Sequence, residues 1–139
     1  MAAAGKHLFI YGTLMSTATG SFGRVARGRL HREARSLGAA TIRGRLYDLG
    51  WQPGLVLGED GIELVHGEAV LLASPEATFE WLDTYEGFDP HNSGLSEYAR
   101  VELPIRLATG EALTAWVYHY VEDASEARPI ADGCWKPRG

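Results

Sequence analysis

The strongest constraint on the fold is a pair of long strand patterns at residues 98–108 and 112–121. In the first, apolar and polar side chains alternate, which is typical of a strand with one buried face. Pro104 lies within it and predicts an edge or bulge position, because proline donates no ladder hydrogen bond. The second segment is apolar on both faces, which predicts a central strand. Thr-Gly-Glu at 109–111 predicts the hairpin turn that joins them.

Further strand patterns precede this hairpin, together with two helical segments. A glycine in the last of these strands, Gly67, predicts a bulge or a close backbone approach. The expected strands are residues 7–12, 41–50, 52–58 and 62–73, and the expected helices are 20–36 and 75–86. Runs of strands without strict alternation with helices predict an α+β fold, either a sheet or a small barrel. The length of 139 residues suits one domain, with about 122–139 as a surface tail.

Composition argues against several classes of protein. The net charge of −5 and the scattered basic residues leave no basic stripe for nucleic acid. No long apolar run is present, so we expect no membrane span. The N-terminal residues do not resemble a signal peptide, and the single cysteine, Cys134, excludes an internal disulfide. These features predict a cytosolic protein.

The helix expected at 75–86 carries a carboxylate in an unusual position. Ser74 and Pro75 are favoured at a helix start, and Gly87 is favoured directly after a helix end. Glu86 follows Phe79 by seven residues, so the two lie about 20° apart around the helix axis. Glu86 is therefore expected at the inner border of the apolar face, whereas Glu76, Glu80, Asp83 and Thr84 are expected outside it.

Partial burial and the negative end of the helix dipole would both raise the pKa of Glu86. A carboxyl group whose pKa is raised toward neutrality suits general acid/base catalysis. The pattern is also compatible with a carboxylate at a frayed helix end that pairs with an arginine or faces solvent, and from the pattern alone this is the favoured interpretation.

The turn after the first strand, Tyr-Gly-Thr-Leu-Met at 11–15, is a second candidate site. A buried strand that ends in Gly-Thr leaves backbone N–H groups free, and Gly12 permits a conformation that aims them at one point. Such a nest would hold a carboxylate or stabilise an oxyanion. An ordinary strand-to-loop turn is the alternative.

Other polar residues support weaker hypotheses. Tyr98 and Arg100 on one strand, and Arg45 and Tyr47 on another, would either line a pocket or lie on the surface. The five histidines show no close ligand spacing, so we expect no metal site.

Seven short motifs, taken in order, resemble those of the γ-glutamylcyclotransferase-like superfamily. They are YGTL, GRLYDLG, PGL, HGE, LDTYEGF, YAR and AWVY. The similarity is greatest to its AIG2-like and γ-glutamylamine cyclotransferase branch, and it extends from about Tyr11 to Tyr118. The resemblance implies a mixed β-barrel with flanking helices and a cavity at one end. The segment GWQPGL, where the family often has Gly-Tyr-Pro-Gly-Leu, departs from the pattern at the pocket rim.

The resemblance also implies roles for particular residues. Tyr11, Gly12, Thr13 and Leu14 match the floor of the family's substrate site, Glu86 matches its general acid/base, and Tyr98 matches a tyrosine of the later strand. No metal or organic cofactor is implied. The expected reaction converts a γ-glutamyl amine or peptide to 5-oxoproline with release of the free amine. A member that binds a small carboxylate or amino-acid-like ligand without turnover is the alternative.

Overall fold

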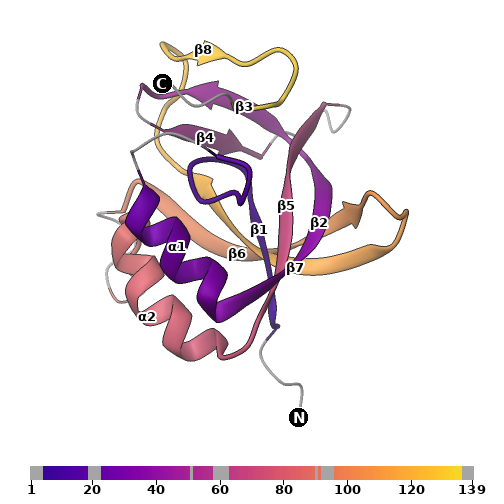
Figure 1. The fold of residues 1–139 in the computed structure, drawn as a ribbon. Coiled ribbons are helices and arrows are strands. Elements are labelled where there is room, and N and C mark those ends of the chain that lie inside the picture. Colours follow the sequence, from indigo (N-terminus) through magenta and orange to yellow (C-terminus); the bar gives the residue numbers. More distant parts are fainter. Residues whose placement is uncertain are drawn as a thin grey trace.

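The computed structural model describes residues 5–18, 23–50, 52–57, 63–89, 91 and 96–135. Five strands form a closed barrel in the order β1-β5-β2-β6-β7 (Figure 1). Their bounds are β1 His7–Ile10, β2 Ala34–Arg43, β5 Leu64–Leu72, β6 Tyr98–Leu107 and β7 Ala112–Tyr120. Neighbouring strands are antiparallel except β1 and β7, which pair in parallel at Leu8 and Trp116. The predicted mixed β-barrel is therefore confirmed.

Two helices and a smaller sheet complete the fold. The helices α1 (Arg24–Glu33) and α2 (Pro75–Glu86) lie side by side on one flank of the barrel (Figure 1). The strands β3 (Arg45–Asp48), β4 (Pro53–Val56) and β8 (Arg128–Pro129) form a sheet in the order β4-β3-β8 at one barrel end. Within the described ranges, no helix is both long and apolar enough to cross a membrane.

Strand β1 buries side chains on both of its faces, which explains its nearly continuous apolar sequence. In β1, Phe9 packs inside the barrel, while Leu8 and Ile10 pack between the barrel and the helices. In α2, Phe79 and Leu82 supply the matching apolar surface. The helices are thus held to the barrel by burial of apolar area.

The predicted bounds of helix α2 are confirmed. Pro75 occupies the first turn, although the Ser74 side chain makes no capping hydrogen bond. Gly87 follows the helix with φ 74°, a left-handed conformation that glycine adopts without steric cost. The N–H of Phe88 donates to the Asp83 carbonyl at 2.8 Å, which closes the last turn.

The prediction for residues 20–50 was partly wrong. The helix ends at Glu33, β2 already begins at Ala34, and β3 is a separate strand. β2 pairs with β5 along its whole length, and a bulge lies between Ser36 and Gly38. Barrel closure supplies this pairing, so the helical propensity of 34–36 is overridden. Residues 20–22 lie outside the described residues.

Two local predictions are confirmed. A β-carbon at Gly67 would overlap the Ile10 carbonyl oxygen and lie 2.7 Å from Phe9 Cζ, so two backbones approach closely here. β6 pairs with β2 at Ala40–Leu107 and Thr41–Arg106 alone among the described positions. Pro104 therefore lies outside the stretch in which β6 pairs with β2, where β6 resembles an edge strand.

The expected surface tail is only partly a surface feature. Residues of β8 are exposed, but the N–H of Ile130 donates to the Leu46 carbonyl at 2.8 Å. The N–H of His66 donates to the Gly133 carbonyl at 2.8 Å. Trp135 is 7% exposed and belongs to the barrel core. The segment through 135 thus packs against one barrel end, because burial of the indole compensates for ordering a polar loop. Residues 136–139 lie outside the described residues.

Candidate active site

The end of α2 and the turn after β1 face one small cavity, which we call the Glu86 cavity. Its volume is about 30 Å³, and its lining residues are 9–14, Gln52, Pro53, Tyr85, Glu86 and Tyr118. The carboxylate and the Tyr11–Leu14 turn, 72 or more residues apart in sequence, therefore meet as the catalytic hypothesis requires. Gln52 and Pro53, from the segment that departs from the family pattern, also line this cavity, whereas Trp51 lies outside the described residues.

Side chains of helix α1 bind two backbone carbonyl groups of the turn. Arg27 Nη1 donates to the Thr13 carbonyl at 2.7 Å. His31 Nε2 lies 2.8 Å from the Leu14 carbonyl and carries the proton of this bond, because a carbonyl only accepts. Two successive carbonyls are thus engaged by α1.

Glu68 on β5 holds the far end of the same turn. Its carboxylate accepts from the Ser16 N–H at 2.7 Å and the Ser16 hydroxyl at 2.9 Å. The Ser36 hydroxyl donates to it at 2.5 Å. Glu68 is only 6% exposed, so these three donors compensate for its loss of hydration. Sequence reasoning missed this residue; the available signal was one acid within the apolar stretch 64–72.

The opposite edge of the turn offers donors. Among the described residues, the N–H groups of Gly12, Thr13 and Leu14 donate to no protein acceptor. Gly12 does not have a positive φ. Instead, a β-carbon there would lie 2.9 Å from two ring carbons of Pro53. The glycine is thus required for space against Pro53.

Glu86 is electrostatically perturbed as expected. Burial and then the negative charge of Asp83 raise its pKa from the usual 4.5 to about 7. The direction predicted from the sequence is confirmed, and Asp83 supplies a second cause that the sequence did not predict. At neutral pH the group can both release and accept a proton.

Two predicted substrate-binding tyrosines use their hydroxyl groups within the protein. Tyr11 donates to the Tyr118 carbonyl at 2.5 Å and accepts from the Leu55 N–H at 3.2 Å. Tyr98 is 2% exposed, is absent from the lining of the Glu86 cavity, and donates to the Pro53 carbonyl at 3.0 Å. Both brace the walls of the cavity, and substrate contact by either remains a prediction.

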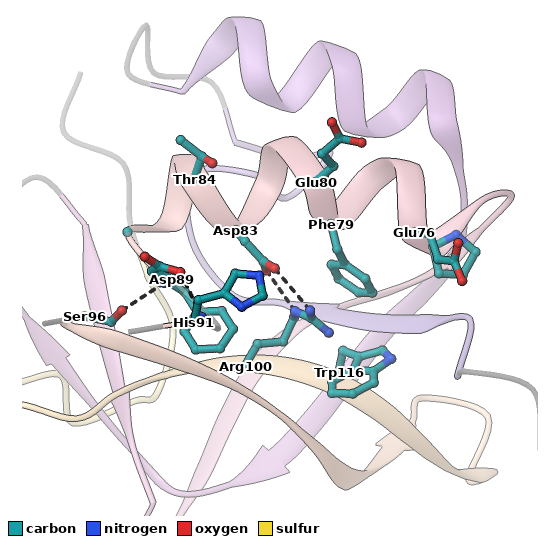
Figure 2. Close-up of a pocket in the computed structure, with 13 residues that line it drawn as sticks. Glu76, Phe79, Glu80, Asp83, Thr84, Asp89, His91, Ser96, Arg100 and Trp116 are labelled. Atoms are coloured by element: carbon teal, nitrogen blue, oxygen red, sulfur yellow. Dashed lines mark hydrogen bonds and ion pairs between the residues drawn. The ribbon is translucent and has the colours of Figure 1, made fainter. Parts of the chain in front are cut away.

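Asp83 contradicts its expected place outside the apolar face of α2. It is buried, because Arg100 and Tyr118 from the barrel strands satisfy its carboxylate. It also lines a second hollow, of about 990 Å³, between α2 and strands β6 and β7, which we call the α2 groove (Figure 2). Of the polar pairs considered from sequence, Arg100 lies in this groove, whereas Arg45 is exposed and pairs with Glu63.

Over the described ranges, no group of three or more His, Cys, Asp and Glu side chains is placed to bind a metal. The Glu86 cavity offers a carboxyl group with a pKa of about 7 and backbone N–H groups that have no protein acceptor among the described residues.

A closed mixed barrel flanked by two helices is the fold of the γ-glutamyl cyclotransferase-like proteins. The sequence profile of one family within that class, "Gamma-glutamyl cyclotransferase, AIG2-like", matches residues 8–137. The chain belongs to this family. A comparison with curated proteins found no match.

Three solved structures illustrate the similarity. YkqA from Bacillus subtilis is 20% identical with a TM-score of 0.68, over 95% of this chain and 40% of YkqA. An AIG2-like protein from Mus musculus is 22% identical with a TM-score of 0.64, over 87% of this chain and 80% of its own. YtfP from Escherichia coli is 28% identical with a TM-score of 0.59, over 93% of this chain and 95% of its own. This chain thus spans well under half of YkqA.

Proposed function

We propose that the protein cyclises the γ-glutamyl group of an amine or peptide to 5-oxoproline and releases the free amine. The observation that carries the proposal is the meeting, in one cavity, of Glu86 and the turn whose N–H groups are unpaired among the described residues. Membership of the γ-glutamyl cyclotransferase, AIG2-like family supports the same reaction.

The reaction needs a group beside the substrate that can accept a proton and later return it. The α-ammonium group of the substrate gives a proton to the Glu86 carboxylate, and the free amine then attacks the side-chain amide carbonyl. A C–N bond forms to close the five-membered lactam, and the C–N bond to the leaving amine breaks. Glu86 returns its proton to the leaving nitrogen, and the second proton of the attacking nitrogen, lost as the lactam forms, passes by the same carboxyl group to the released amine. A pKa about 7 permits both transfers at neutral pH.

The turn would bind the negative charge of the substrate. The N–H groups of Gly12, Thr13 and Leu14 would donate to the α-carboxylate or to the oxyanion that develops during attack. Because nucleophile and electrophile belong to one molecule, holding the γ-glutamyl group folded supplies much of the rate acceleration.

A substrate of this size requires the rim of the cavity to open. A volume of about 30 Å³ corresponds to little more than a water molecule. Tyr85 is 37% exposed, and its hydroxyl lies 3.5 Å from Thr13 Oγ1, at the limit of a hydrogen bond. We expect this side chain to move aside when substrate binds.

The test is to incubate the protein with a series of γ-glutamyl amines and peptides and to measure 5-oxoproline. Glu86→Gln preserves the shape of the side chain and should remove turnover. Glu80→Gln, an exposed acid on the same helix, is the matched control and should leave turnover unchanged. Equal turnover by wild type and Glu86→Gln would exclude the proposed role of Glu86. Ligand-induced stabilisation by γ-glutamyl compounds without 5-oxoproline would instead indicate a binding protein.

A further inference from the structure

Asp83 on α2 is held by three hydrogen bonds from two barrel strands, β6 and β7. Arg100 donates to it twice, from Nε at 2.8 Å and Nη2 at 3.1 Å (Figure 2). The Tyr118 hydroxyl also donates to it, at 2.6 Å. The guanidinium lies 3.9 Å from the ring centre of Phe79 and 4.5 Å from that of Trp116. This bidentate, aromatic-flanked ion pair fixes the position of the Asp83 carboxylate.

Asp83 separates the α2 groove from the Glu86 cavity. Its carboxylate contacts Arg100 in the groove, while its other donor, Tyr118, lines the cavity. Asp83 also precedes Glu86 by three residues, and side chains at this spacing are neighbours on a helix. A fixed negative charge therefore lies beside Glu86.

The charge of Glu86 in turn acts on titratable groups from four elements around it. They are four phenols, one each from α2, β6, β7 and the turn after β1: Tyr85, Tyr98, Tyr118 and Tyr11. Burial raises the pKa of each phenol above 10, so all four are neutral at pH 7. After burial, the negative charge of Asp83 is the second cause that raises the pKa of Glu86.

We propose that Asp83, held by Arg100 and Tyr118, is a positioning residue whose fixed charge keeps Glu86 able to exchange a proton at neutral pH. Without that charge, Glu86 would be a weaker base and a poorer acceptor for the α-ammonium proton. The catalytic part of this inference rests on the proposed cyclisation, whereas the electrostatic part does not.

The experiment titrates Glu86 directly and in parallel with turnover. Protein labelled with ¹³C at the glutamate side-chain carboxyl carbon is titrated by NMR, and the Glu86 signal is assigned by its loss in Glu86→Gln. Asp83→Asn should lower the pKa of Glu86 by about one pH unit. Arg100→Gln should raise it, because Asp83 would then act without its neutralising partner. Glu80→Gln is the control and should not change it.

The acid limb of kcat/KM against pH should move in the same two opposite directions. If Asp83→Asn folds poorly, the double variant Asp83→Asn/Arg100→Gln removes both buried charges together and should also lower the pKa of Glu86, by less. A Glu86 pKa that does not change in the Asp83 variants, or lost turnover with an unchanged pH profile, would overturn the inference. Absence of turnover in wild type, with the expected NMR shifts, would refute the proposed cyclisation and still support the electrostatic inference.

Discussion

Replacing Glu86 by glutamine should stabilise the protein at high pH, because it removes a negative charge from a buried position. The pKa of Glu86 rises from the usual 4.5 to about 7 on folding. The folded state therefore binds this proton more tightly than the unfolded state does. The stability contributed by the protonated carboxyl group is fully present below pH 4.5 and is lost as the pH rises through 7.

The size of the effect follows from the same shift. A rise from 4.5 to about 7 corresponds to roughly 3 kcal/mol of unfolding free energy. Because Glu86 lines a cavity and is not fully buried, hydration reduces this to about 2 kcal/mol. Glu86→Gln should therefore exceed wild type in unfolding free energy by about 2 kcal/mol at pH 8 and match it near pH 4.

Urea denaturation of both proteins across this pH range is the assay. Glu80→Gln removes an exposed acid from the same helix and should show no such pH-dependent gain. If the difference between Glu86→Gln and wild type were the same at pH 4 and pH 8, Glu86 would not have a raised pKa. The acid/base argument would then lose its electrostatic basis.

Three further substitutions test the packing around the site. Gly67→Ala should destabilise the fold by about 3 kcal/mol in urea denaturation, because its methyl group would overlap the Ile10 carbonyl; an unchanged midpoint would show that the strands separate freely. Glu68→Gln should cost about 2 kcal/mol and raise KM more than it lowers kcat, since Ser16 loses a charged acceptor; an unaltered KM would remove its role in holding the turn. Trp135→Ala should cost about 4 kcal/mol by thermal unfolding; a loss below about 1 kcal/mol would show that the segment does not stabilise the barrel.

Much of the fold was predictable because its signals are local. The bounds of α2 followed from Ser74-Pro75 and Gly87, and the β6–β7 hairpin followed from alternation around a turn. The start of β2 at Ala34 was not predictable, because residues 34–36 permit a helix and form a strand only by pairing with β5. In the sequence, Trp135 lies in a polar tail. It is buried only because its side chain packs into the core of the barrel.

The candidate site also has features that the sequence predicts and features that only the tertiary structure shows. The sequence by itself determined that Glu86 ends a helix on its apolar border and that a Gly-Thr turn follows a buried strand, since helix phase and strand ends are properties of neighbouring residues. Only the tertiary structure decided that the two share a cavity and that Glu68 holds the turn from another strand. It also decided that Asp83 is buried, because its partners Arg100 and Tyr118 are distant in sequence. Buried charge depends on such partners, and helix periodicity carries no information about them.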